Sequence, residues 1–169
     1  MYKTKVIFVT FVAICLSVLI ASSFVHKDAQ PGVGISPGSS FPDMTKLVKN
    51  APENLLSNLN GEYVLIQFWA AYDAESRMKN VQLCNSLNQK NSNIKFLSVS
   101  MDPYKEISFE TIRLDKIPNE NVWIPNVDQR EKLLTEFAPK GKLTNYLVSP
   151  EGVIIAKDIS AKELAQMKI

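Results

Sequence analysis

The sequence predicts an α/β domain, and three observations support this prediction. Short apolar runs rich in β-branched and aromatic residues alternate with segments of helical spacing, in the order β-α-β-α-α-β-β-α. Of the 169 residues, 46% are apolar and 21% are charged, which is typical of a chain with a packed core. No internal repeat or low-complexity segment interrupts this order. A single domain of ordinary size therefore accounts for most of the chain.

Local patterns predict each strand and helix. The run YVLIQFW over 63–69 is almost wholly apolar, as in a strand covered on both faces, and 94–100 is a second strand. In the helix predicted over 74–90, apolar residues recur every three positions, at Met78, Val81, Cys84 and Leu87. The remaining elements are helices over 104–116 and 128–137, strands over 144–149 and 153–157, and a last helix that opens with the capping box Ser160 to Glu163. We expect 118–125 to be irregular.

The charge distribution argues against nucleic-acid binding. The chain holds 19 basic and 17 acidic residues. Residues 1–37 contain three lysines and one aspartate, which leaves 16 basic and 16 acidic residues in 38–169. A neutral domain offers no footprint for a phosphate backbone. Two cysteines and one histidine are also too few for a zinc site, and no glycine-rich loop follows a strand, so we expect no metal or cofactor.

The N-terminal segment predicts export. Lys3 and Lys5 precede an uncharged apolar run over 6–25, and small residues lie near the end of that run. This is the pattern of a signal peptide, and the run is also long enough to span a bilayer uncleaved. We therefore expect 1–25 to be a signal peptide or membrane anchor, 26–40, rich in Pro, Gly and Ser, to be a flexible tether, and 41–169 to be the domain. The domain would lie on the periplasmic side of the inner membrane, anchored there or secreted after cleavage.

Three segments together resemble a known family. They are GEYVLIQFWAAYDAESR (61–77), FLSVSMDPYKE (96–106) and LTNYLVSPEGVIIAKDI (143–159). In order and spacing they resemble thioredoxin-like proteins, and most closely the membrane-tethered thiol–disulfide proteins of the TlpA/ResA kind. The resemblance covers roughly 38–169 and implies a thioredoxin-like fold, with a central mixed sheet flanked by helices.

The same resemblance implies that the family's chemistry has been lost. Thioredoxin-type catalysis needs a thiolate at the start of the first helix and a second cysteine three residues later. Those positions are occupied by Asp73 and Ser76. Gln67 replaces a buried acid that serves as a proton shuttle in many relatives, and Leu143 replaces their cis-proline. Asp73 would instead be an N-cap whose carboxylate accepts N–H groups of the first turn.

Other catalytic hypotheses have less support from the residues. Cys84 shares a helical stripe with Val81 and Leu87, as expected for a buried, unreactive thiol. The chain's one histidine, His26, lies in the tether. Asp73 and Glu75 could form an acid–base pair or half a metal site, but no third ligand lies nearby in the sequence.

Two functional hypotheses follow. The first is a redox-inactive module that binds an extracytoplasmic protein, with the membrane reached through residues 6–25 if they are retained. The residues expected to contact the partner are Trp69, Tyr72, Asp73, Glu75, Ser76, Leu143 and Thr144. The second is a residual thiol redox or antioxidant protein that uses Cys84 alone, which requires that thiol to be accessible.

Overall fold

A five-stranded sheet forms the centre of the computed structural model, which describes residues 31–49, 61–90 and 93–169. The strand order is β3-β2-β1-β4-β5. The strands are β1 (Tyr63–Trp69), β2 (Ile94–Ser100), β3 (Val122–Trp123), β4 (Asn145–Val148) and β5 (Ile154–Lys157). β1, β2 and β3 are parallel, whereas β4 is antiparallel to β1 and β5 is antiparallel to β4. The sheet is therefore mixed, as the resemblance implies.

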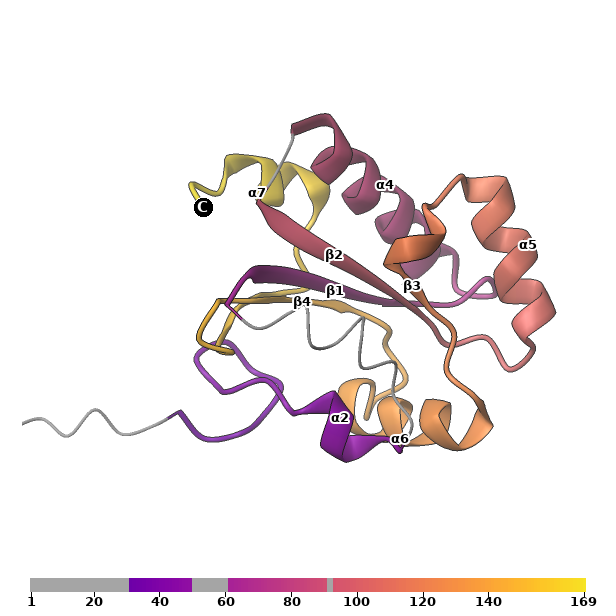
Figure 1. Cartoon of the computed structure of the whole chain (residues 1–169), viewed down its shortest axis with the longest axis horizontal. Coiled ribbons are helices and arrows are strands. Elements are labelled where there is room, and N and C mark those ends of the chain that lie inside the picture. Colours follow the sequence, from indigo (N-terminus) through magenta and orange to yellow (C-terminus); the bar gives the residue numbers. More distant parts are fainter. Residues whose placement is uncertain (1–30, 50–60, 91–92) are drawn as a thin grey trace, which may run out of the picture. The chain divides into compact units, whose positions relative to one another are not determined.

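Helices cover both faces of the sheet (Figure 1). One face carries α4 (Ala74–Lys90), α5 (Lys105–Asp115) and α7 (Ala161–Gln166), and the other carries α2 (Met44–Leu47) and α6 (Val127–Phe137). Side chains of β1 alternate between the two faces. Leu65 packs in a cluster with residues of α4 and α7, while Phe68 packs with residues of α2 and α6. The run 63–69 is apolar throughout because both of its faces are covered.

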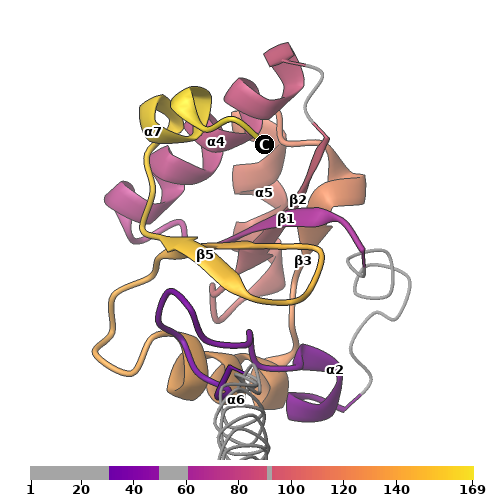
Figure 2. The ribbon, with the colours of Figure 1, turned by 90° about the vertical axis from the view of Figure 1, so that its left-hand side faces the viewer.

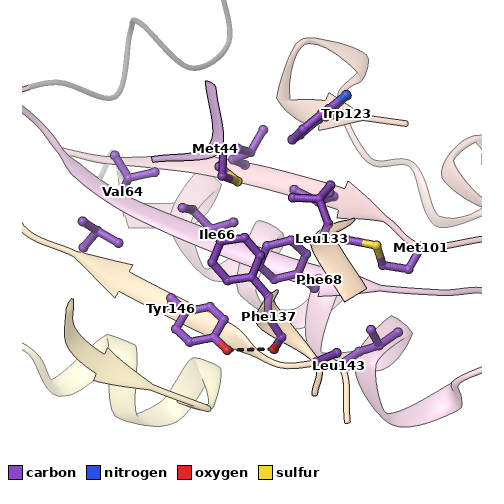
Figure 3. Close-up of a cluster of buried hydrophobic side chains, with 14 of the residues drawn as sticks. Met44, Val64, Ile66, Phe68, Met101, Trp123, Leu133, Phe137, Leu143 and Tyr146 are labelled. Carbon is purple, nitrogen blue, oxygen red and sulfur yellow. Dashed lines mark hydrogen bonds between the residues drawn. The ribbon is translucent and has the colours of Figure 1, made fainter. Parts of the chain in front are cut away.

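The larger part of the core lies between the sheet and α6 (Figure 3). Phe68 of β1 stacks on Phe137 of α6 with a centroid separation of 4.8 Å, and Tyr146 of β4 meets both rings edge-on. The Tyr146 hydroxyl donates to the Phe137 carbonyl at 2.9 Å. Trp123 of β3, which is 5% exposed, belongs to the same cluster.

Most predicted elements are confirmed, and three short ones were missed. The strands over 63–69 and 94–100 and the helix over 74–90 have the predicted bounds. The helix predicted from 104 begins one residue later, and the segment expected to be irregular contains a 3₁₀ turn, η1 (Asn119–Asn121), and the two-residue strand β3. The helix α2 was not predicted. It is a single turn, too short to show a period of apolar residues.

The start of the domain also differs from the prediction. Residues 31–40 were expected to be flexible, but this segment is hydrogen-bonded to β5 and the turn before it (Figure 2). Gly38 N–H donates to the Ile154 carbonyl at 2.8 Å, and Ile154 N–H donates to the Ser39 carbonyl at 2.9 Å. The compact unit consequently begins at Pro31 rather than at residue 41. The predicted leader, and tether residues 26–30, lie outside the described residues.

Candidate functional site

The candidate site is the turn that joins β1 to α4. Ser76, in the first turn of α4, is 1% exposed. Its hydroxyl accepts a hydrogen bond from Ala70 N–H at 3.3 Å and donates to the Asp73 carbonyl at 3.2 Å. The Asp73 carbonyl also accepts from Arg77 N–H at 3.0 Å, which starts the helix. Ser76, which stands where the resemblance places the second cysteine, therefore stabilises this turn.

The expected capping role of the Asp73 carboxylate is wrong. Within the described part of the chain, no hydrogen bond reaches this carboxylate, although Asp73 does mark the start of the helix. True capping boxes are found elsewhere: Asn126 accepts from Gln129 N–H at the start of α6, and Ser160 accepts from Glu163 N–H at the start of α7. The box at Ser160 was predicted and is confirmed.

A second carboxylate holds the loop before α4. Asp102, which follows β2, is 4% exposed, and its two oxygens lie 2.9 and 3.1 Å from the Ala71 nitrogen that donates to them. The Ser100 hydroxyl donates to the same carboxylate at 3.0 Å and lies 2.9 Å from the Ser108 hydroxyl. This role of Asp102 was not predicted from the sequence. An acidic residue two positions after the end of β2, the strand next to β1, was the available signal.

Beneath α4, the predicted proton-shuttle position holds a neutral amide. Gln67 is fully buried, and its side-chain oxygen accepts from the Asn145 amide at 3.0 Å. Asn145 also exchanges hydrogen bonds with the backbone of Ile159, through the carbonyl and the N–H. The pair therefore ties β1 to β4 and to the start of α7. An amide cannot titrate, so it offers no proton transfer at this position.

Leu143 and Thr144 lie on the approach to β4. They are 5% and 4% exposed, and every peptide bond in the described residues is trans. Trp69 is also buried, at 1%, and its indole N–H donates to the Ser98 hydroxyl at 2.7 Å. With Ser76, these residues were expected to contact a partner, and burial removes them from that surface. Of the predicted set, Tyr72 remains well exposed, at 67%, with Glu75 exposed and Asp73 partly exposed beside it.

Cys84 lies on the buried side of α4. Its side chain is 2% exposed and packs in a cluster with Trp69, Ile112 and Ile117. Burial raises the pKa of the Cys84 thiol, although the Asn88 amide, 3.7 Å from the sulfur, partly offsets this. A buried thiol with a raised pKa is a poor nucleophile. The expectation of a buried cysteine is confirmed.

An ion-pair network fixes the loop before β4 to α4. Lys79 lies 3.1 Å from Glu75 and 2.6 Å from Asp158, and Lys142 pairs with the other Asp158 oxygen. Burial opposes ionisation of Asp158, but the hydrogen bonds from Lys142 and Lys79 prevail and lower the pKa of Asp158 to about 2. Glu75 is thus engaged by Lys79 and is not available to act with Asp73.

A groove of about 420 Å³ lies between α4 and α5. Ala74, Arg77, Met78, Val81 and Gln82 line it along α4. Ala71 from the preceding turn and Asp115 from α5 complete the lining. The Arg77 guanidinium makes two hydrogen bonds to Asp115, at 2.7 and 2.8 Å. This bidentate ion pair holds α5 against α4. The two residues are 38 positions apart in the sequence, and no local pattern indicated their contact.

The described residues contain neither a candidate metal cluster nor a helix that could span a membrane. No cluster of three or more His, Cys, Asp and Glu side chains in 31–49, 61–90 and 93–169 could hold a metal ion. Among the helices of these same ranges, none combines the length and the apolar character needed to cross a bilayer.

Three solved structures that resemble this one are thioredoxin-like or thiol–disulfide proteins. A thioredoxin-like protein from Parabacteroides distasonis is 32% identical with a TM-score of 0.68, over 79% of this chain and 95% of that chain. The thioredoxin domain of a thiol-disulfide oxidoreductase from Bacteroides vulgatus is 29% identical with a TM-score of 0.58, over 65% and 79%. A thiol:disulfide interchange protein from a Bacteroides species is 29% identical with a TM-score of 0.57, over 65% and 72%. Neither a family model nor a curated protein matches the chain.

Proposed function

The chain belongs to the thioredoxin-like proteins, and from this premise we propose that it is a redox-inactive member, a protein-binding or accessory module that works outside the cytoplasm. Two of the similar solved proteins are described as a thiol-disulfide oxidoreductase and a thiol:disulfide interchange protein. The present chain would keep their fold without their reaction.

One observation carries this proposal. In the described part of the chain the only cysteine, Cys84, is 2% exposed. Thiol–disulfide exchange begins with attack by an accessible thiolate. At the helix start, where that thiolate would be needed, Asp73 supplies a carboxylate and Ser76 a hydroxyl that is committed to the turn. Neither group can form a mixed disulfide.

The location outside the cytoplasm is supported by the sequence. Lys3 and Lys5, followed by the apolar run over 6–25, have the pattern of an export signal or an uncleaved anchor. Either outcome would place the domain beyond the inner membrane. An anchored domain would meet its partner at the membrane surface, and a cleaved one would meet it in the periplasm.

A residual redox role for Cys84 is the competing hypothesis, and the same burial weighs against it. The thiol would become reactive only if α4 separated from the sheet, which would also expose Trp69 and Ile112. The apolar area involved makes such an opening costly.

Insulin reduction by dithiothreitol tests the proposal. The full chain should accelerate the reaction no more than buffer does, and the Cys84→Ser and Cys15→Ser variants should behave identically. Activity that disappears in the Cys84→Ser variant alone would establish a one-cysteine redox protein and would overturn the proposal. The Cys15→Ser variant is the matched control, because it separates the contribution of the thiol in the N-terminal segment.

A further inference from the structure

The groove between α4 and α5 presents an open, mostly apolar surface. Ala74, Met78 and Val81 lie on successive turns of one face of α4, so the groove follows the helix for two turns. Its volume is about 420 Å³, and it is an open surface groove and not an enclosed cleft. Met78 is 59% exposed, and Tyr72, which follows the lining residue Ala71, is 67% exposed. Aromatic, methionine and arginine side chains are enriched in protein interfaces.

The two charged side chains that line the groove are paired with each other. Arg77 is held by Asp115, and the exposed Arg113 on α5 is held by Glu110 at 2.6 Å. A charged ligand would therefore have to break an existing pair or lie unpaired beside it. Segments 71–82 and 102–116 together hold six acidic and five basic residues, so they do not attract an anionic lipid surface. An uncharged, apolar segment is therefore the ligand that best matches this groove.

The opposite side of the candidate site is closed. Leu143, Thr144 and Asn145 are buried, and Lys142 just before them is paired with Asp158. A partner that approached there would meet side chains already packed into the domain. The exposed apolar surface at the start of α4 is thus on the side of Tyr72, Met78 and the groove.

We propose that the α4–α5 groove binds an uncharged, apolar segment of a partner protein, with a leucine, methionine or phenylalanine side chain placed over Ala74 and Val81. The proposal rests on the proposed function in one respect, since it names the surface and the partner chemistry of the accessory module. Arg77 and Asp115 bound the groove as an intact pair and reject segments that carry charge. Met78 and Tyr72 form its exposed rim.

Methyl NMR of the full chain, labelled with ¹³C at its methionine methyl groups, tests this proposal. Met78 reports on the groove, while the buried Met44 and Met101 report on the fold. The probe is the peptide acetyl-Gly-Ser-Phe-Leu-Ser-Gly-amide, and the control peptide carries Ser and Asp in place of Phe and Leu. The apolar peptide should shift the Met78 signal saturably and leave Met44 and Met101 unmoved. The control peptide should shift none of them.

Matched substitutions locate the binding. Ala74→Glu puts a carboxylate into the groove at the first residue of α4, where an acidic residue is favourable for the helix. It should weaken peptide binding by about tenfold or more. Asn85→Glu makes the same kind of change at an exposed position of α4 outside the groove, and it should leave affinity within about twofold. If the Ala74→Glu variant shifts the Met44 and Met101 signals, its fold is disturbed. The Gln82→Glu variant, which also places a carboxylate in the groove lining, is then used in its place.

Three outcomes would overturn the proposal. The first is no Met78 shift with the apolar peptide, and the second is an equal affinity in wild type and the Ala74→Glu variant. The third is a Met78 shift on raising the protein concentration alone, together with a doubled mass by light scattering, which would assign the groove to a second copy of the chain. Insulin reduction, measured on the same samples, tests the proposed function separately. Redox activity together with peptide binding would overturn the redox-inactive function and support binding in the groove. Inactivity without peptide binding would support the redox-inactive function and overturn binding in the groove.

Discussion

A hydrogen bond of 3.2 Å joins the Ser76 hydroxyl to the Asp73 carbonyl, and so connects the two positions at which the resemblance predicts cysteines. The same hydroxyl accepts from Ala70 N–H. In a redox-active relative, cysteines at these two positions would carry out thiol–disulfide exchange. Here the second position supports the backbone of the turn, so the loss of sulfur is accompanied by a structural use of the oxygen that replaces it.

Ser76→Ala should therefore destabilise the protein. The substitution removes a hydroxyl that makes two hydrogen bonds and leaves the N–H of Ala70, a buried residue, without a side-chain partner. A typical cost is about 1 kcal/mol in the free energy of unfolding, measured by urea denaturation. Ser86→Ala, at a half-buried position in the interior of the same helix, is the control, and it should be neutral or slightly stabilising because alanine is the better helix former. A higher denaturation midpoint for Ser76→Ala than for wild type would contradict this role.

Asp73→Ala should have a small effect. No hydrogen bond within the described residues reaches the Asp73 carboxylate, which leaves a favourable interaction with the helix dipole of about 0.5 kcal/mol. Asn126→Ala removes a complete capping box from α6 and should cost about 1 kcal/mol or more. Thermal melts of the two variants give the comparison. Equal losses of stability would show that Asp73 caps α4 after all.

The contrast between Asp73 and Asn126 shows where sequence reasoning succeeds. Helix α4 and strands β1 and β2 were predicted with their bounds because each extends for seven residues or more and has a clear apolar pattern. Side-chain capping depends on rotamer and loop geometry, so the residue type alone does not determine it. Ser160, followed by Glu163, was predicted correctly because both halves of that box are visible in the sequence.

The long-range contacts of the site could not be predicted. Asp102 reaches Ala71 across 31 positions, and Arg77 reaches Asp115 across 38. Both contacts depend on the parallel pairing of β1 with β2 and on the placement of α5 beside α4, which local patterns do not encode. The pairing of 31–40 with β5 was missed for the same reason, since a segment rich in Pro, Gly and Ser has no strand pattern of its own.

Restoring both cysteines should not restore efficient catalysis. The Asp73→Cys/Ser76→Cys variant supplies an attacking and a resolving thiol, but Gln67 cannot shuttle a proton and Leu143 is buried in the loop before β4. We expect the variant to form an internal disulfide, detected by mass spectrometry, and to reduce insulin only weakly. Adding Gln67→Glu should raise that activity if proton transfer is the missing component. High activity of the two-cysteine variant alone would show that Gln67 and Leu143 are compatible with exchange.

Cys84 should react slowly with a thiol reagent in the folded protein. It is 2% exposed, and burial raises the pKa of its thiol, so both access and thiolate fraction are reduced. The absorbance change with Ellman's reagent should be slow in buffer and fast in urea, where α4 separates from the sheet. The Cys15→Ser variant isolates the Cys84 signal. A fast reaction in buffer, comparable to that in urea, would revive the one-cysteine redox hypothesis.

Asp158 should make stability fall at low pH. Its pKa of about 2 in the folded protein lies below the ordinary value of 3.8, because the pairs with Lys142 and Lys79 outweigh the burial of the carboxylate. A group with a lowered folded-state pKa contributes stability that is fully present above about pH 4 and is lost as the pH falls towards 2. The contribution is at most about 2 kcal/mol, since Asp158 is partly exposed and solvent screens the pairs.

Asp158→Asn is the suitable variant, because Asp158 has a φ of 57° and asparagine tolerates this left-handed conformation. The difference in unfolding free energy between wild type and Asp158→Asn should be largest near neutral pH and should shrink between pH 4 and 2. Glu110→Gln, which breaks the exposed pair with Arg113, should show little difference at any pH. A wild-type advantage over Asp158→Asn that stays constant down to pH 2 would show that Asp158 acts through its hydrogen bonds and not through its charge.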